Sequence, residues 1–131
     1  MEFKDYQGMK YALTFSGMQE IHADMLSEIA NDEGALEIYR TVLTKSIRYT
    51  RTRAEWGLMT VEEKMEGDPA RTALHDSLII NFDKLSRYLK LQGKKAAWRD
   101  RLGSVEDDPA YRKRIGDMAD YLTFVEALLH R

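Results

Sequence analysis

Residues 71–89, with the sequence RTALHDSLIINFDKLSRYL, decide the fold class of this chain. Large apolar side chains recur in this stretch at intervals of three and four positions, at Leu74, Leu78, Phe82, Leu85 and Leu89. Because an α-helix turns once in about 3.6 residues, this spacing places all of them on one face of a helix. The stretch therefore predicts an amphipathic helix whose apolar face packs against a core.

The same spacing recurs on both sides of this stretch. The other sets are Met18, Ile21, Met25 and Ile29; Leu36, Tyr39, Leu43 and Ile47; and Tyr111, Ile115, Met118, Leu122, Val125 and Leu129. No stretch shows the sustained alternation of apolar and polar residues that is typical of a strand. The sequence therefore predicts an all-α, single-domain bundle of about four main helices, at roughly residues 8–30, 35–57, 69–92 and 109–129.

Helix ends are indicated by polar residues and prolines. Asp68-Pro69 and Asp108-Pro109 are predicted to start the third and fourth helices, because Asp caps a helix N-terminus and Pro suits its first position. Thr60-Val61-Glu62-Glu63 has the pattern of a capping box and predicts a short extra turn. A second short turn is predicted at residues 96–102, around Trp98.

Composition bounds the class of protein. With 44% hydrophobic and 32% charged residues, the chain 1–131 is expected to form one globular domain, with residues 1–15 as a loosely packed segment. No aliphatic run approaches the roughly 18 residues of a membrane span, and residues 1–6 lack the pattern of a secretory signal. The absence of cysteine excludes disulfides and Cys-ligated zinc. These features favour a cytoplasmic protein that does not associate with membranes.

The net charge is only −2, but the charges alternate in blocks. Residues 38–54 carry five bases and no acid, residues 55–83 carry seven acids against two bases, and residues 84–102 carry seven bases against Asp100. If consecutive helices lie antiparallel, each basic surface has an acidic neighbour. The alternative is a basic strip for an anionic partner such as nucleic acid, which the pI near 5.9 disfavours.

A polar cluster interrupts the apolar stripe of the third predicted helix. Charged groups on a core-facing surface need partners, because an isolated buried charge costs several kcal/mol. We expect Arg71 or Arg99 to pair with Asp117, beside Gly116, whose missing side chain allows another segment to approach closely. The residues predicted to form one network are Arg71, His75, Asp76, Trp98, Arg99 and Asp117.

These residues belong to a wider pattern over about residues 48–129. Its segments are Arg71-Thr72-x-x-His75-Asp76, Leu85-Ser86-Arg87-Tyr88-Leu89, Trp98-Arg99-x-x-Leu102-Gly103 and Arg112-Lys113-x-Ile115-Gly116-Asp117. The set resembles a family of small uncharacterised all-helical bacterial proteins, classed as a domain of unknown function. In that family Gly-Asp is followed by Phe-Ala-x-Tyr, whereas this chain has Met118-Ala119-Asp120-Tyr121. The resemblance implies a helical fold and a bacterial, intracellular setting, and it implies no activity.

Two metal sites are alternatives to a structural network. His22, His75, Asp76 and Asp117, with Asp120 as a substitute ligand, follow the order of ligands in histidine-aspartate metal phosphohydrolases. Such ligands hold a divalent metal that lowers the pKa of a bound water. The second set, Glu63-x-x-Glu66 with Asp117-x-x-Asp120, is similar to the paired acids of all-α nucleotide pyrophosphohydrolases, although acids near a turn are usually exposed.

Aromatic and basic residues offer a third kind of site. Base stacking or peptide binding would use Tyr49, Arg53, Trp56, Arg87, Tyr88, Trp98 and Arg99. Aromatic residues at helical spacing are more often partly buried, with a hydrogen-bonded polar end. The sequence therefore favours a non-enzymatic protein-interaction or regulatory module without a cofactor and with the potential to form a homodimer. A metal-dependent phosphohydrolase-like enzyme that uses His75, Asp76 and Asp117 is the alternative.

Overall fold

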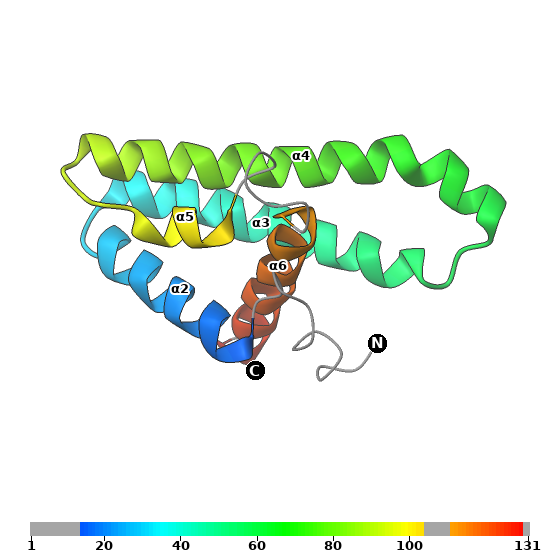
Figure 1. The fold of residues 1–131 in the computed structure, drawn as a ribbon, viewed down its shortest axis with the longest axis horizontal. Helices are drawn as coiled ribbons and strands as arrows, with labels where there is room; N and C mark the ends of the chain where they lie inside the picture. The colour runs from blue at the N-terminus through cyan, green and yellow to red at the C-terminus, as the bar shows by residue number, and fades with distance from the viewer. Residues whose placement is uncertain (1–13, 104–110, 130–131) are drawn as a thin grey trace.

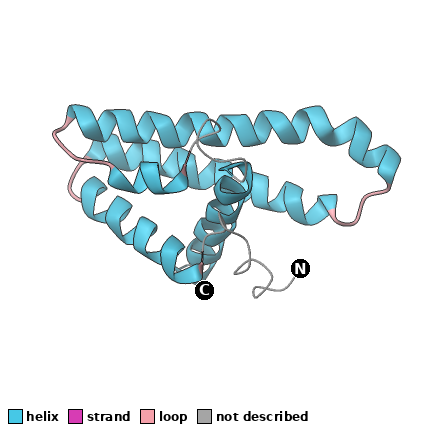
Figure 2. Ribbon diagram, viewed as in Figure 1, coloured by secondary structure: helices cyan, strands magenta, loops and turns pink. Residues whose placement is uncertain are grey.

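The computed structural model describes residues 14–103 and 111–129, and within them it contains five helices and no strand. The helices are α2 (Phe15–Ile29), α3 (Glu33–Trp56), α4 (Val61–Leu91), α5 (Ala97–Leu102) and α6 (Tyr111–Leu129). The predicted all-α bundle is confirmed (Figure 2). None of these helices combines the length and the apolar character needed to cross a membrane.

The helices are arranged around one antiparallel pair. Helices α3 and α4 run side by side along the long axis of the molecule, and α6 crosses them steeply near the middle (Figure 1). Helices α2 and α5 pack against each other beside one half of this pair. The other half, where α3 ends and α4 begins, projects beyond α6 (Figure 1).

Apolar side chains from all five helices meet in one core. The largest fully buried residues are Ile21 and Met25 of α2, Val42 of α3, Leu78, Phe82, Leu85 and Leu89 of α4, Trp98 and Leu102 of α5, and Ile115, Met118 and Leu122 of α6. Complete burial of a side chain of this size contributes about 1.5–3 kcal/mol before the cost of ordering it. The apolar stripe predicted for residues 74–89 is therefore the centre of the fold.

Helix α3 buries a different stripe from the predicted one. Its buried residues are Ala35, Tyr39, Val42, Ser46 and Tyr49, whereas Leu36 is exposed and Leu43 and Ile47 are half-buried. The period of the prediction was correct, but the face was rotated. The small residues Ala35 and Ser46 in this stripe allow the neighbouring helices to approach α3 closely.

The start of α4 was predicted wrongly. The helix begins at Val61 and continues through Pro69, so Asp68-Pro69 does not start it. The capping box at Thr60 is present: the Thr60 hydroxyl accepts the backbone N–H of Glu63 at 3.1 Å, and the Glu63 carboxylate accepts the backbone N–H of Thr60 at 2.9 Å. The hydrogen bond from the Thr60 backbone N–H, with a further one from the Thr60 side chain, lowers the pKa of the Glu63 carboxyl. Good helix formers before Gly67 and after Pro69 extend the predicted extra turn into one long helix, despite the unfavourable Gly67 and Asp68 and the backbone hydrogen bond that proline removes.

The other predicted helix boundaries concern the first helix, the turn around Trp98 and the start of the last helix. Helix α2 begins at Phe15, after Thr14, whose side chain accepts the backbone N–H of Gly17 at 2.9 Å. The predicted turn around Trp98 is confirmed as α5. The predicted first helix, 8–30, was too long at its start, because Thr14 is extended and α2 does not include it. Residue 8 itself and the Asp108-Pro109 pair lie outside the described residues.

Candidate functional site

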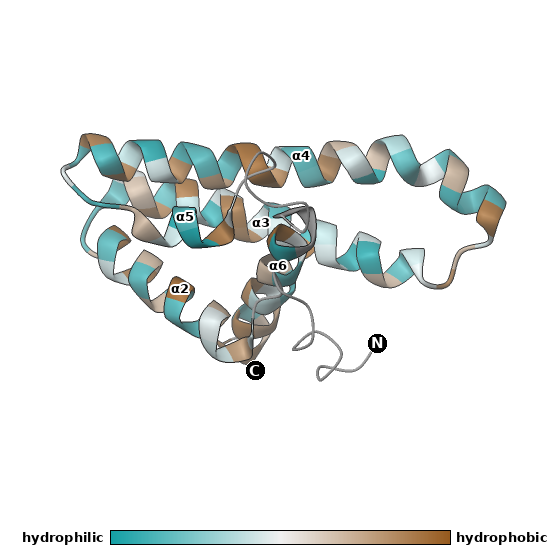
Figure 3. Ribbon diagram, in the orientation of Figure 1, coloured by the Kyte–Doolittle hydropathy of each residue, from teal (hydrophilic) through white to brown (hydrophobic). Residues whose placement is uncertain are grey.

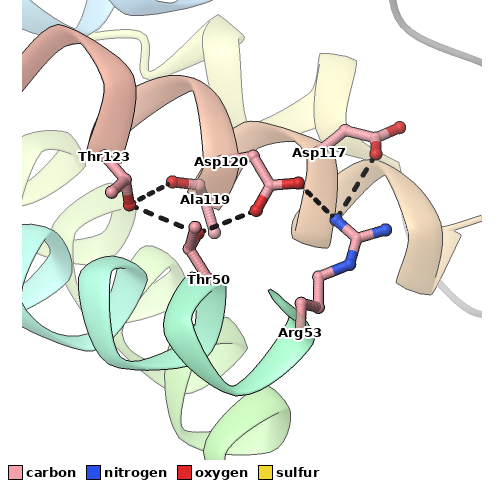
Figure 4. A network of polar contacts seen from close by, with 6 residues as sticks. All are labelled: Thr50, Arg53, Asp117, Ala119, Asp120 and Thr123. Atoms are coloured by element: carbon pink, nitrogen blue, oxygen red, sulfur yellow. Dashed lines mark hydrogen bonds and ion pairs between the residues drawn. The ribbon is translucent and has the colours of Figure 1, made fainter. Parts of the chain in front are cut away.

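A polar network joins α3 to α6 where the two helices cross (Figure 4). Arg53 Nη1 lies 2.8 Å from Asp120 Oδ2 and 3.5 Å from Asp117 Oδ1. The Thr50 hydroxyl donates to Asp120 Oδ1 at 2.8 Å, and the Thr123 hydroxyl lies 3.2 Å from that of Thr50. Because Thr50 and Arg53 are three residues apart, both project from the same side of α3. The network therefore fixes α3 against α6.

Gly116 makes room for this network. A Cβ atom at Gly116 would lie 2.9 Å from Arg53 Nη1 and 3.3 Å from Tyr49 Cε1, both closer than ordinary contacts. The sequence predicted a close approach at this glycine, and the approaching groups are the side chains of Arg53 and Tyr49. The arginine beside Asp117 is Arg53, which corrects the expectation that Arg71 or Arg99 fills that position.

Arg99 and Trp98 lie at a different place, on α5. Arg99 Nε donates to Asp83 Oδ1 of α4 at 2.6 Å, and its Nη1 donates to the Gly103 carbonyl at 2.8 Å. The fully buried Trp98 donates its indole N–H to Glu28 of α2 at 2.7 Å. These bonds hold α5 against α2 and α4.

Arg71 lies towards the projecting part of α4. Its guanidinium stacks over the Trp56 ring, 4.8 Å from the ring centroid, and its Nη1 lies 4.0 Å from Asp68. Its Nε is buried without a hydrogen-bond acceptor among the described residues. The buried His75 lies against Tyr49, with ring centroids 5.2 Å apart, and Asp76 is half-buried beside it.

The described contacts therefore place five of the six predicted residues in three groups, and Asp76 follows His75 directly on α4. His75 and Asp117 both lie near Tyr49 and Arg53 of α3, Trp98 and Arg99 lie on α5, and Arg71 lies with Trp56. Sequence reasoning missed the partners Glu28 and Asp83. Glu28 carried a detectable signal, because it lies three residues after Met25 on the buried stripe of α2.

The structure does not bring the candidate metal ligands together among the residues that it describes. His22 is buried against Tyr39, with 2.7 Å between Nε2 and Oη, and burial lowers its pKa. Tyr39 and Tyr49, which contact His22 and His75, lie about 15 Å apart along α3. Among the residues that the structure describes, no three His, Asp or Glu side chains are placed to hold a metal ion.

The aromatic and basic residues that were candidates for base stacking or peptide binding lie in different parts of the molecule. Tyr49 and Trp98 are buried, and the Tyr88 hydroxyl donates to Asp32 at 2.8 Å. Trp56, the last residue of α3, is the aromatic member at the end of the hairpin, and it lies under Arg71. The set therefore does not assemble into one surface for stacked bases.

A polar cleft of about 630 Å³ lies between α4 and α5. Its lining includes Arg87, Lys90 and Arg99, together with the carboxylates of Asp83 and Asp100. Arg99 uses its Nε to bind Asp83 and its Nη1 to bind a backbone carbonyl, so this cation is engaged within the protein itself. The other two cations of the lining, Arg87 and Lys90, are exposed, and the carboxylates of Asp83 and Asp100 lie in the same cleft.

The end of the α3–α4 hairpin is the most unusual surface in the described part of the chain. Residues 50–74, which we call the hairpin end, include no buried residue. Large apolar side chains are nevertheless present, since Leu58 is 89%, Val61 74% and Met65 73% exposed. Hydrophobic colour reaches the loop that joins the two helices (Figure 3). Single exposed apolar residues are ordinary, but a cluster of this kind marks an interaction surface.

A groove runs along the hairpin end. It has a volume of about 380 Å³ and is lined by Trp56, Val61, Lys64, Met65 and Asp68. Three of these lining residues are apolar, and the other two are the cation Lys64 and the anion Asp68. A groove of this composition fits an amphipathic helix better than a small polar substrate.

Comparison of the chain with known protein families, with curated proteins and with solved structures gives no match in any of the three.

Proposed function

We propose that this protein is a non-enzymatic interaction module that binds a helical segment of a protein partner at the hairpin end. Its docking surface consists of Trp56, Leu58, Val61 and Met65. The observation that carries the proposal is that residues 50–74 include no buried residue, while Leu58, Val61 and Met65 are largely exposed to solvent.

The energetics favour an added helix at this place. Two antiparallel helices alone cannot enclose a core, because each has only one neighbour. A third helix laid along the groove would cover Val61 and Met65, and burial of each such side chain contributes about 1.5–3 kcal/mol towards the cost of association.

The polar network of Arg53, Asp117 and Asp120 supports this role. It lies at the base of the hairpin end, where α6 crosses α3. A docking surface whose orientation is fixed before binding loses less entropy when the partner arrives. In this proposal the network positions the docking surface and does not contact the partner.

The setting of this function is part of the proposal. We place the module in the bacterial cytoplasm, on the absence of cysteine and on the resemblance to the helical bacterial family described above. The polar groups act as structural elements, so the proposed function needs no metal or other cofactor.

Site-specific crosslinking in the producing cells tests the proposal. A photo-reactive amino acid is placed at position 65 or, as a control, at position 91, because Leu91 is 85% exposed at the opposite end of α4. We expect one defined protein, identified by mass spectrometry, to crosslink from position 65 and not from position 91. The substitution Val61→Glu is expected to abolish that product. Equal products from both positions, or none from position 65, would contradict the proposal.

A further inference from the structure

We infer that the partner at the hairpin end is a second copy of this chain, packed antiparallel about a two-fold axis. This inference rests on the proposed function, because it names the occupant of the same docking surface.

Charge complementarity within the hairpin carries the inference. Residues 55–68, at the tip, contain five acids against the single base Lys64. Residues 38–54, which precede them on α3, contain five bases and no acid. Glu62 and Glu66 at the tip are exposed, and so are Arg48 and Arg51 behind it. The hairpin therefore carries exposed acids at its tip and exposed bases in the adjoining segment of α3.

Two-fold symmetry makes this arrangement self-complementary. In an interface of this symmetry, a residue i that contacts j of the partner is matched by j contacting i. When two hairpin ends overlap in antiparallel directions, the acidic tip of each copy lies on the basic segment of the other. Parallel overlap would place acids on acids and bases on bases, which costs free energy. The charges therefore select the antiparallel dimer.

Apolar packing supplies the driving force for the same arrangement. Two antiparallel hairpins form a four-helix assembly, in which the exposed Leu58, Val61 and Met65 of both copies are covered together. The described overhang of α4, from residue 61 to residue 74, is about 20 Å long. Because this overlap is short, the dimer is expected to be weak and to depend on concentration.

A charge-reversal experiment tests the pairing. The tip variant carries Glu62→Lys and Glu66→Lys, which lie four residues apart on one side of α4. The base variant carries Arg48→Glu and Arg51→Glu, which lie three residues apart on one side of α3. Sedimentation velocity of the full chain, from about 1 µM to about 200 µM, measures the dimer.

The expected results form a specific pattern. The wild type dimerises with rising concentration, and each variant alone is weakened at least about tenfold, because like charges then meet at both contacts. An equimolar mixture of the tip and base variants restores the dimer to within about threefold of the wild type, because the reversed tip now faces the reversed basic segment.

A matched control separates this effect from a general effect of charge. Glu33→Lys with Glu37→Lys makes the same change on the first turns of α3, at the opposite end of the hairpin, where both residues are exposed. This control is expected to dimerise as the wild type does, and circular dichroism checks that all variants remain helical.

Other outcomes overturn the inference. A wild type that stays monomeric throughout, variants that still dimerise, or a mixture that stays monomeric would each exclude the antiparallel pairing of charges. A different protein crosslinked specifically from position 65 would also overturn this inference, while leaving the proposed function in place.

Discussion

Glu28 on α2 accepts the indole N–H of Trp98 on α5 at 2.7 Å, although the two residues are 70 positions apart in the sequence. The same carboxylate accepts the backbone N–H of Ala96 at 3.0 Å. Ala96 has a φ of 49°, in the left-handed region that a residue with a side chain seldom adopts. One half-buried carboxylate therefore holds both the buried Trp98 and the strained residue that precedes α5.

The first prediction concerns this carboxylate. Glu28→Ala is expected to lower the free energy of unfolding by about 1–3 kcal/mol, because the buried indole N–H loses its acceptor. Glu28→Gln keeps one acceptor oxygen and is expected to have a smaller effect. Urea denaturation followed by tryptophan fluorescence measures both. Glu20 is the control, because its ion pair with Arg101 also joins α2 to α5 but is exposed, so Glu20→Ala is expected to change stability little. Equal losses for Glu20→Ala and Glu28→Ala would contradict the account.

Two helical glycines are expected to respond to alanine with opposite signs. Gly116→Ala pushes its new Cβ against Arg53 and Tyr49, so we expect a net destabilisation of about 1 kcal/mol, even after the gain in helix propensity. At Gly67 the nearest atom to a new Cβ is Trp56 Cζ3 at 3.6 Å, which is an ordinary contact. Gly67→Ala is therefore expected to stabilise the protein by up to about 1 kcal/mol. Thermal denaturation measures both, and a stabilising Gly116→Ala would be inconsistent with the close contact.

His22 is expected to make stability depend on pH. Burial lowers its pKa below the ordinary 6.5, and burial raises the pKa of Tyr39, so the neutral imidazole keeps its bond to the Tyr39 hydroxyl. Because protonation is then easier in the unfolded chain, the contribution of His22 is complete above pH 6.5 and is lost as the pH falls below it. The difference in stability between the wild type and His22→Gln should therefore shrink between about pH 7 and about pH 5. An NMR titration that gives His22 a pKa at or above 6.5 would refute this prediction.

Arg53 is expected to hold the hairpin end in place. Arg53→Met removes the ion pairs with Asp117 and Asp120, and because these groups are partly exposed we expect a loss of about 1–2 kcal/mol in the free energy of unfolding. Arg51, on the exposed side of α3, is the matched control, and in dilute solution Arg51→Met should change stability by less than about 0.5 kcal/mol. Chemical denaturation measures the free energy of unfolding of both variants. An equal decrease for Arg53→Met and Arg51→Met would contradict the stabilising role of the network.

The sequence predicted those parts of the fold that follow from local periodicity. Leu78, Phe82, Leu85 and Leu89 lie on the predicted stripe, and all four are fully buried. Pro69 was misinterpreted because its position after Asp68 satisfies the pattern of a helix start. The capping box eight residues earlier had already begun the helix. The hairpin end was consequently missed, since residues 58–68 were not assigned to a long helix.

Local sequence patterns could not predict which acidic residue pairs with which basic residue. Arg53 and Asp120 are 67 positions apart, and Arg99 and Asp83 meet only because α5 folds back beside α4. The sequence showed that buried polar groups need partners, but it offered several acids for each base. Which acid is chosen depends on how the helices cross, and that is a property of the whole packing arrangement.

The most direct test of the docking surface is amide hydrogen exchange along α4, measured at low and at high protein concentration. In dilute solution residues 61–74 are expected to exchange faster than residues 75–89 of the same helix, because only the latter contribute buried side chains. At high concentration protection should rise in residues 61–74 and stay constant in residues 75–89. Exchange in residues 61–74 that is already as slow as in residues 75–89, and that does not change with concentration or with added partner, would contradict the claim that this end of the hairpin is an interaction surface.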